Sequence, residues 1–396
     1  MQLKLKGLLV KRDIQPLIIF FLLMLGVAAL LWWRLGTLTH GYSPEELRSL
    51  QQSLSLKYIF NHPLNAPFYI IASGFYRVIG DSLLAVRLAS AVFGLASIGI
   101  FYWLVRFWHG SRSALIGTIL FGTSAWFLHT ARFGSPDVLL FLLLGLVASA
   151  VWIRHSKTGW PLLVGFALAT ALIYVPGMIW FIALGVLWQW KRIDRLFKRN
   201  LIAVTIGALV VVAALAPLVW ALYQHPELGK QVLGLPAQGW PDPLASLKAL
   251  VHVPLAFLWR SPENPAHWLA RLPILDAFTL AMTGLGIYLY AKYWRLKRSR
   301  FVCLAIVSGS ILIALGGHVT LSIIMPFMFI LAATGTDFML EYWQRVFPRN
   351  IIAQAVGTVI LAFAIFIAVW YNLRHYYVAW PDAPPTRAAF NIRSNS

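Results

Sequence analysis

The sequence predicts an all-α protein that crosses a membrane many times, and two observations indicate this class. Of its 396 residues, 60% are hydrophobic and only 12% are charged, whereas a soluble domain carries about 25% charged residues. Apolar runs also recur along the whole chain, and roughly 20 apolar residues in a helix cross the hydrocarbon core of a bilayer. We therefore expect a polytopic α-helical membrane protein.

About eleven runs are long enough to be membrane spans. They lie at about residues 15–35, 85–105, 113–130, 137–153, 159–174, 176–190, 201–223, 274–291, 301–316, 320–340 and 351–371. The first run has bulky Trp32 and Trp33 near its end and no small-residue cleavage site, so we expect an uncleaved span and not a signal peptide. The runs predict one transmembrane domain over residues 1–371.

The basic residues gather on one side of this predicted arrangement. With the N-terminus in the cytoplasm, 20 of the 33 Lys and Arg residues fall in cytoplasmic segments, against 4 of the 13 Asp and Glu residues. Cytoplasmic loops of membrane proteins carry such an excess. The net charge of +20 is therefore explained by the orientation of the protein in the membrane. We expect basic runs such as 297–300 to contact anionic lipids, and we expect no nucleic-acid partner.

Two outer segments, residues 36–84 and 224–273, are too long to be simple connections, and long ordered loops usually carry function. In the first, Ser43-Pro44 predicts the start of an interfacial helix that reaches about Tyr58, and a second helix runs from 68 to 79. In the second, we expect a helix over 243–259. Residues 372–396 form a short outer tail, of which 381–396 is expected to be poorly ordered.

Two adjacent carboxylates, Glu45 and Glu46, open the first interfacial helix. One interpretation is structural: Ser43 as N-cap with Glu46 at the third helical position forms a capping box, and Glu45 also favours a helix N-terminus. The other is catalytic, because a carboxylate on an outer-face helix suits a general base. Capping occupies Glu46 more than Glu45, so one carboxylate is left for chemistry.

A second acidic position lies at the outer turn between the third and fourth spans. Asp137 follows Ser135-Pro136 and stabilises a helix end in the structural interpretation, while Arg132 extends toward the membrane surface. Together they also suit a site that handles a phosphate leaving group and an acceptor hydroxyl. Other basic residues on the same side have the same two interpretations, and Arg87 is the best phosphate candidate by depth. They are Lys57, Arg77, Arg87, Lys230, Lys248, Arg260 and Arg271.

No pattern in the sequence predicts a metal or a nucleotide site. His62 and His318 lie singly at span ends, and Cys303 lies inside an apolar run. There is no His-x-x-x-His pair, no Cys-x-x-Cys, no Walker A loop and no Gly-x-Ser-x-Gly turn. A divalent metal remains open, and the scarcity of ionisable residues in span centres argues against a proton-coupled transporter.

Four stretches in a fixed order resemble the GT-C glycosyltransferases of the protein O-mannosyltransferase and lipid A aminoarabinose transferase type. They are His-Pro-Leu-Asn-Ala-Pro-Phe-Tyr at 62–69, Phe-Tyr-Arg-Val-Ile-Gly-Asp-Ser at 75–82, Leu-Ala-Val-Arg-Leu-Ala-Ser at 84–90 and the acidic turn that ends at 137. A late span with Met325-Pro326, entered after Gly317-His318, adds to the likeness.

The resemblance implies a polyprenyl-phosphate-linked sugar donor, an inverting transfer on the outer face and a first-loop carboxylate that deprotonates the acceptor. Glu45 matches the Asp of the family's Asp-Glu pair, Glu46 matches its Glu, and Asp137 matches the second-loop acid. Arg87 or Arg132 would hold the donor phosphate. The donor or acceptor pocket would involve Tyr42, His62, Asn65, His318 and Arg260.

One departure from the family matters, because Glu45 stands where the catalytic Asp is usual. Either its reach is adjusted, or Glu46 is the base, or activity is altered or absent. We therefore predict a bacterial plasma-membrane glycosyltransferase whose acceptor is a lipid, a glycan or a protein. The alternatives are a membrane protein that binds or translocates lipid-linked sugar without catalysis, and an inactive family member that serves as an assembly partner.

Overall fold

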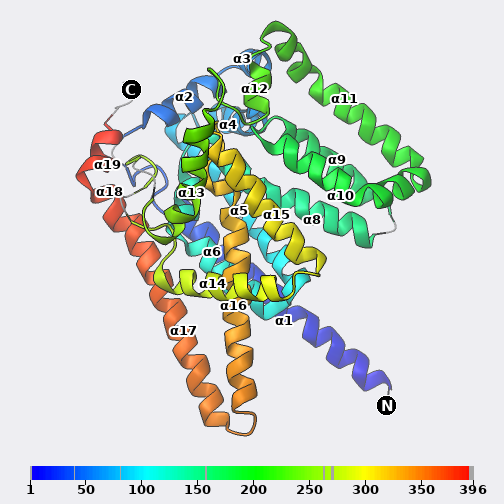
Figure 1. The fold of residues 1–396 in the computed structure, drawn as a ribbon, viewed down its shortest axis with the longest axis vertical. Helices are drawn as coiled ribbons and strands as arrows, with labels where there is room; N and C mark the ends of the chain where they lie inside the picture. Colours follow the sequence, from blue (N-terminus) through cyan, green and yellow to red (C-terminus); the bar gives the residue numbers. More distant parts are fainter. Residues whose placement is uncertain are drawn as a thin grey trace.

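The computed structural model describes residues 2–391, except residues 40, 81, 157, 262–263 and 269–271. Across these residues the chain forms helices joined by loops, with no β-strand. Figure 1 shows a helical assembly in which the start of α1 and the end of the chain lie at opposite corners. The predicted all-α class is confirmed.

Every predicted span is helical in the structure. The elements concerned are α1 (Gln2–Trp32), α5 (Ser82–His109), α6 (Ser111–Thr123), α7 (Ala125–Arg132), η1 (Pro136–Leu142), α8 (Leu143–His155), α9 (Trp160–Ile173), α10 (Met178–Arg199), α11 (Leu201–Gln224), α14 (Ala277–Lys292), α15 (Lys297–Ala314), η2 (Leu321–Ile323), α16 (Met325–Val346) and α17 (Ile351–Arg374). Some helices extend beyond the predicted runs: α10 continues from the run at 176–190 to Arg199, and α16 continues from the run at 320–340 to Val346.

Four helices among the described residues are long and apolar enough to cross a membrane by themselves, and a bent pair makes a fifth. The pair is α6 and α7, which meet at 62° because Ser124 between them is extended and caps α7. Five shorter apolar helices accompany them. The count of eleven spans therefore stays a prediction.

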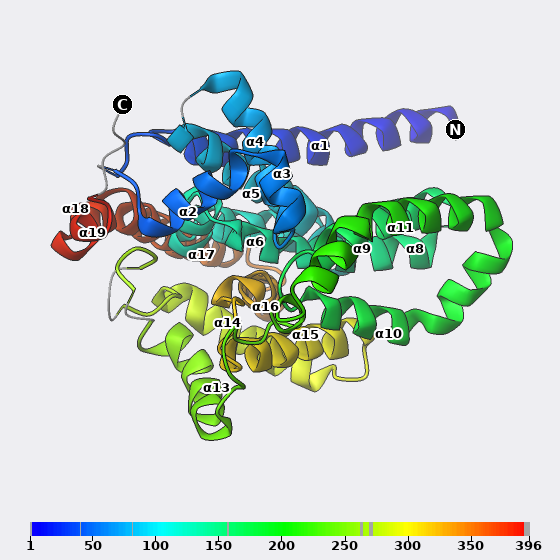
Figure 2. The same cartoon turned by 90° about the horizontal axis from the view of Figure 1, so that it is seen from above.

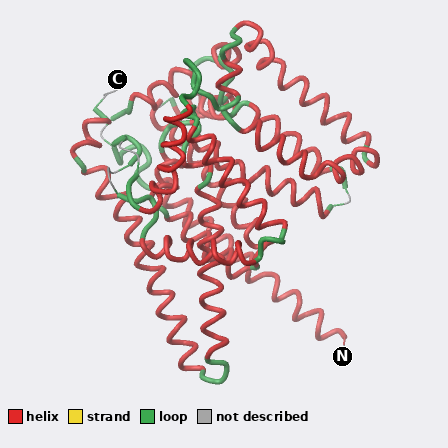
Figure 3. Tube along the Cα trace, in the orientation of Figure 1, coloured by secondary structure: helices red, strands yellow, loops and turns green. Residues whose placement is uncertain are grey.

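The two long outer segments fold into short helices, as the sequence predicts for all of them except α12. They are α2 (Pro44–Ser53), α3 (Leu56–Asn61), α4 (Ala66–Ile79), α12 (Leu228–Val232) and α13 (Pro243–Leu258). The helix expected to reach Tyr58 is broken, because Ser55 is extended and starts α3. Gly80 ends α4 in a left-handed conformation that glycine adopts without strain. Loop segments gather at the end of the molecule where these helices lie (Figure 3).

The C-terminal tail is ordered, so the expectation of poor order is wrong for residues 381–391. After α17 the chain makes a π-turn, η3 (His375–Ala379), and two short helices, α18 (Trp380–Asp382) and α19 (Pro384–Ala389). The rings of Trp380 and Phe390 are buried and pack edge to face. These apolar rings in a polar stretch stabilise the tail. Residues 392–396 lie outside the described residues.

The core contains a cluster of phenylalanine rings contributed by α5, α6, α7 and α16. Phe121 lies 4.8 Å from Phe127, 4.9 Å from Phe101 and 5.3 Å from Phe329 between ring centroids. Outside it, α11 presents large apolar side chains such as Leu209 and Val212 to the surroundings. An apolar exterior around a packed apolar core is the arrangement of a membrane protein.

Glycines allow α14 and α16 to pack backbone against backbone, next to each other in Figure 2. A Cβ added at Gly335 would overlap the carbonyl oxygen of Met282, and one at Gly286 would overlap that of Leu331. Small residues at such crossings are typical of helix pairs in membranes.

We expect Gly335→Ala to lower the stability of the protein by about 1–3 kcal/mol, because the added methyl group forces the two backbones apart. The matched control is Gly284→Ala on α14, where a Cβ meets nothing within 4 Å. Thermal unfolding in detergent measures both. Equal melting temperatures for the two variants would contradict the close crossing.

Candidate active site

A cavity of about 610 Å³ lies where α2, the start of α4, η1 and the loops before η2 and after α13 converge. Its lining brings together five of the residues that the sequence singled out: Glu45, His62, Asn65, Asp137 and His318. These residues are separated by up to 273 positions in the chain. The tertiary structure therefore joins the two acidic positions in one cavity.

Glu46 has a structural role. Its side chain is fully buried, and it accepts hydrogen bonds from the backbone N–H of Ser43 at 3.2 Å and of Gly134 at 3.2 Å. Arg87 donates to both carboxylate oxygens, from Nε to Oε1 at 2.7 Å and from Nη2 to Oε2 at 3.0 Å. Ser43 completes the predicted capping box.

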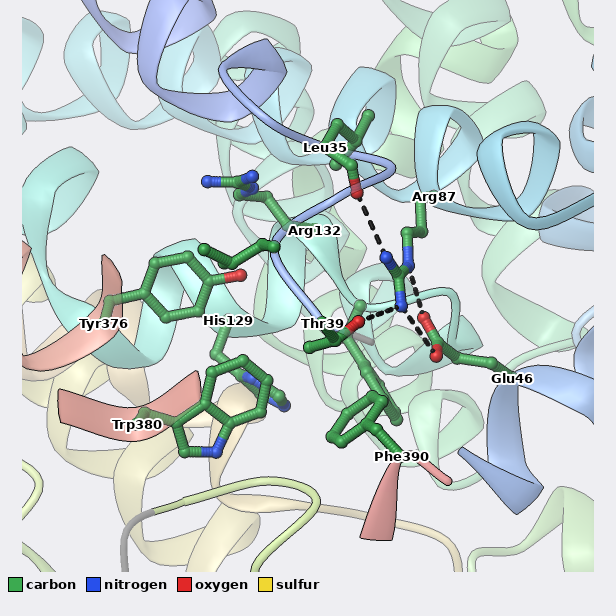
Figure 4. Close-up of a pocket in the computed structure, with 11 residues that line it drawn as sticks. Leu35, Thr39, Glu46, Arg87, His129, Arg132, Tyr376, Trp380 and Phe390 are labelled. Carbon is green, nitrogen blue, oxygen red and sulfur yellow. Dashed lines mark hydrogen bonds and ion pairs between the residues drawn. The ribbon is translucent and has the colours of Figure 1, made fainter. Parts of the chain in front are cut away.

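Arg87 also has a structural role. Besides Glu46, its guanidinium donates to the carbonyl oxygen of Leu35 at 3.1 Å and to Thr39 Oγ1 at 2.7 Å. Figure 4 shows these bonds converging on the one guanidinium group. Since its donors are directed at groups of this chain, a phosphate would have to displace them, and the phosphate-binding role of Arg87 stays a prediction that this geometry does not favour.

Glu45, in contrast, faces the cavity with 41% of its side chain exposed. His267, from the loop after α13, lies at hydrogen-bond distance from both of its oxygens, 3.0 Å to Oε1 and 2.9 Å to Oε2. The capping box holds the helix end through Glu46 and leaves the neighbouring carboxylate for the cavity. The two adjacent glutamates thus have different environments.

The pKa values of this pair move in opposite directions. Burial raises the pKa of Glu45, but the hydrogen bond and charge of His267, with the charge of Arg48, outweigh it and bring the pKa below its usual 4.5. Burial lowers the pKa of His267, but the hydrogen bond and charge of Glu45 outweigh it and bring the pKa above its usual 6.5. The pair is therefore an ion pair in slightly acidic solution.

Asp137 occupies the far wall of the same cavity. Ser135 Oγ accepts a hydrogen bond from the backbone N–H of Asp137 at 3.2 Å and so fixes the start of η1. The carboxylate also borders a second chamber of about 320 Å³, which shares Ser135, His267 and Thr320 with the first. Asp137 and His267 thus stand between two connected spaces.

The second chamber has polar groups without partners. Both ring nitrogens of buried His129 lack a hydrogen-bond partner within the described part of the chain. Trp126 lies on the same wall and donates its indole N–H to Ser322 at 3.0 Å. Because buried polar groups are normally hydrogen-bonded, this chamber suits a polar ligand.

Arg132 faces away from this cavity. It donates to the carbonyl oxygens of Leu30 at 3.3 Å and Trp33 at 2.6 Å. Its guanidinium lies over the rings of Tyr376 and Tyr377, 5.3 and 4.8 Å from their centroids. Figure 4 shows it beside Tyr376, on the other side of Thr39 from Glu46.

Four of the predicted residues, Tyr42, Lys57, Arg77 and Arg260, do not line the cavity. Tyr42 is buried, whereas Lys57, Arg77 and Arg260 are exposed. Asn65 does line it and adopts a left-handed conformation, φ 57°, in which its backbone N–H donates to Tyr174 at 2.8 Å. Across residues 2–391, apart from the undescribed positions, no three His, Cys, Asp or Glu side chains are placed to hold a metal ion.

Sequence reasoning missed two cavity residues, Arg48 and His267. Arg48 lies three residues after Glu45 on α2, so helical spacing places both on one face and could have identified it. His267 is 222 residues from Glu45 in a loop of mixed composition. No local pattern connects the two, and only the fold of the second outer segment brings them together.

Two crystal structures share this fold. ArnT from Cupriavidus metallidurans in the apo state superposes with a TM-score of 0.59 at 15% identity, over 93% of this chain and 77% of ArnT. ArnT from the same organism bound to undecaprenyl phosphate gives 0.55 at 15% identity, over 94% and 77%. The chain has the GT-C fold of ArnT. The fold that the resemblance implied is thereby confirmed.

Sequence relatives point to the same type. A family model described as dolichyl-phosphate-mannose-protein mannosyltransferase matches residues 61–220. Two proteins of Pseudomonas fluorescens (strain Pf0-1), undecaprenyl phosphate-alpha-4-amino-4-deoxy-L-arabinose arabinosyl transferases 1 and 2, are 26% and 25% identical over 300 and 297 residues. The aligned regions cover 69% and 70% of this chain but 49% and 51% of the relatives, so the chain spans about half their length.

We expect Glu46→Gln to destabilise the protein by about 3 kcal/mol, because it leaves the charge of Arg87 buried without its partner. Glu45→Gln, its neighbour, should cost far less, since that side chain is partly exposed. Thermal unfolding of the two variants measures the difference. The double variant Glu46→Gln/Arg87→Met should recover part of the loss, and no recovery would contradict a direct coupling.

The Glu45–His267 ion pair predicts a pH-dependent contribution to stability. Since the pKa of His267 is raised, its contribution is complete below about 6.5 and is lost as the pH rises through the raised value. Since the pKa of Glu45 is lowered, its contribution is complete above about 4.5 and is lost as the pH falls through the lowered value.

We therefore expect wild type to exceed His267→Gln in melting temperature most between about pH 4.5 and 6.5, with the difference shrinking above. The effect is below about 1 kcal/mol because solvent screens the exposed part of Glu45. His225→Gln, at an exposed histidine outside the cavity, is the control. A difference that does not vary with pH would contradict the ion pair.

Proposed function

We propose that this protein transfers a sugar from a polyprenyl-phosphate-linked donor to an acceptor on the outer face of a bacterial plasma membrane. The observation that carries the proposal is the cavity in which Glu45 and Asp137 meet beside Arg48, His62 and His318. The ArnT fold, seen with bound undecaprenyl phosphate in one crystal structure, and the relatives named as arabinosyl transferases support it.

Glu45 is the general base of the proposed reaction. Its carboxylate takes the proton of an acceptor hydroxyl while that oxygen attacks the anomeric carbon of the sugar. The bond from the anomeric carbon to the phosphate oxygen breaks, and the polyprenyl phosphate leaves with the electron pair. An attack opposite the leaving group inverts the anomeric centre.

The lowered pKa of Glu45 keeps this base ionised at neutral pH. His267 holds the carboxylate from the cavity side, so that the longer glutamate has a fixed direction although aspartate is usual at this position. Glu46 is unsuited to the same role because four donors already bind its two oxygens in a buried position. The choice between the two glutamates therefore falls on Glu45.

The leaving phosphate requires positive charge that is not already paired. Arg48 is exposed and lines the cavity three residues from Glu45, and His318 faces it from the loop before η2. The guanidinium of Arg48 and an imidazole N–H of His318 can donate hydrogen bonds to a departing phosphate. We assign the phosphate to these two residues in place of Arg87, whose guanidinium is paired with Glu46 and Leu35, and of Arg132, which does not line this cavity.

Asp137 faces the same space as Glu45 and separates it from the second chamber. We propose that Asp137 accepts a hydrogen bond from the sugar or from the acceptor hydroxyl. Its carboxylate borders both spaces, so it can accept hydrogen bonds from a ligand in either of them. The acceptor class, whether lipid, glycan or protein, and the identity of the sugar are left for assay with defined donors.

We expect Glu45→Gln and Asp137→Asn each to lower sugar transfer at least about 100-fold, because each removes a carboxylate that the reaction uses. The assay supplies undecaprenyl-phosphate-linked sugars to membranes that contain the variant and measures donor consumption. Asp194→Asn, which removes a carboxylate from the exposed i,i+4 pair with Lys198, is the control.

Full activity in both cavity variants would overturn the assigned roles. If wild type binds the labelled donor without consuming it, the protein is instead a binding or translocating protein of the alternative class. Failure of wild type to bind any polyprenyl-phosphate sugar would leave an assembly role in place of both.

A further inference from the structure

A second, separate cavity system lies on the other side of the molecule, between α13, α14, α15 and α16. Figure 2 shows these helices grouped at one edge, away from α2 and α4. The larger part is a cleft of about 580 Å³ lined almost entirely by apolar side chains, among them Val253, Ile306 and Met328. A chamber of about 370 Å³ adjoins it and shares Tyr290 and Ser299 with it.

The adjoining chamber is polar, unlike the cleft. Its walls include His109, Arg298, Asp337 and Glu341. The hydroxyl of Tyr290, at the boundary between the two spaces, lies 2.7 Å from His109 Nε2. The combined space is therefore amphipathic, with an apolar length and a polar end.

The charges of the polar chamber leave one cation uncompensated. Asp337 pairs with Arg112 and accepts from Ser113, and Glu341 pairs with Arg345 at 2.5 Å. Arg298 donates to the carbonyl oxygen of Trp108 and makes no ion pair with any acidic residue in the described part of the chain. Since both acids of the chamber already have cationic partners, the net field at Arg298 favours an anion.

The surroundings of this chamber are strongly basic. The connection from α14 to α15 carries five Lys and Arg residues within 292–300 and no Asp or Glu. Three connections that the charge distribution places in the cytoplasm, 106–112, 292–300 and 341–350, meet at the chamber. Basic pockets between helices on the cytoplasmic side are suited to the head groups of anionic lipids.

We propose that this cleft and chamber form a binding site for an anionic phospholipid of the inner leaflet, with the phosphate at Arg298 and an acyl chain along the apolar cleft. The site does not depend on the proposed sugar transfer, and none of its lining residues lines the cavity of Glu45 and Asp137. A lipid held here would pack α13 and α15 against α14 at the edge of the bundle.

The test titrates purified protein in detergent with dioleoyl phosphatidylglycerol and dioleoyl phosphatidylcholine, and native mass spectrometry counts bound lipid. We expect phosphatidylglycerol to bind more tightly. Arg298→Gln should weaken its binding about fivefold by removal of one charge, and Arg298→Lys should stay close to wild type. Arg349→Gln, at an exposed arginine of a neighbouring cytoplasmic connection, is the matched control.

A second variant tests the apolar part. Ser310→Phe fills the cleft, so it should weaken phosphatidylglycerol binding while leaving the basic chamber intact. Variants are compared only when they elute as a single peak of wild-type size. Glycerol 3-phosphate, which carries the head-group charge without acyl chains, should not compete.

Equal binding of the two phospholipids, equal losses in the variants at Arg298 and Arg349, or competition by glycerol 3-phosphate would overturn the site. The Glu45→Gln variant should bind phosphatidylglycerol as wild type does. Loss of lipid binding in Arg298→Gln with unchanged binding of the sugar donor distinguishes this site from the outer cavity.

Discussion

The buried ion pair of Glu46 and Arg87 is the interaction on which the region around the candidate active site depends. It joins α2 to α5, and through the carbonyl of Leu35 and the N–H of Gly134 it also holds the chain after α1 and the turn before η1. The two charges can be buried here because their hydrogen bonds offset the cost of removing them from water. Four segments between Leu35 and Gly134 are thereby fixed around one carboxylate.

This arrangement divides the labour between adjacent glutamates. Position 46 of α2 points into the protein and satisfies both the helix end and Arg87, while position 45 points into the cavity toward His267. Successive residues on a helix are about 100° apart, so one helix end can serve both purposes. The structural interpretation and the catalytic one are therefore both compatible with the pair, each for a different residue.

The basic side chains also fall into two groups, some buried and paired within the chain and some exposed to a cavity. Arg87 and Arg132 are buried and donate to groups of this chain, and they shape the first turn after α1 and the ordered C-terminal tail. Arg48 and His318 are exposed to the cavity, where a ligand can reach them. At the opposite edge, Arg298 stands at the polar end of an apolar cleft. The expected depth in the membrane did not show which arginine is available to a ligand, because this depends on the groups of the chain with which each guanidinium is already paired.

The sequence by itself determined the local structure: the helical runs, the capping box at Ser43, the start of η1 after Ser135 and the short helices of the outer segments. Each follows from residues within a few positions of one another, where period and capping act. Only the tertiary structure decided which carboxylate faces the cavity, that His267 joins Glu45, and that Trp380 and Phe390 order the tail. These contacts join residues that are 10 to 222 positions apart, and their geometry depends on how the helices pack.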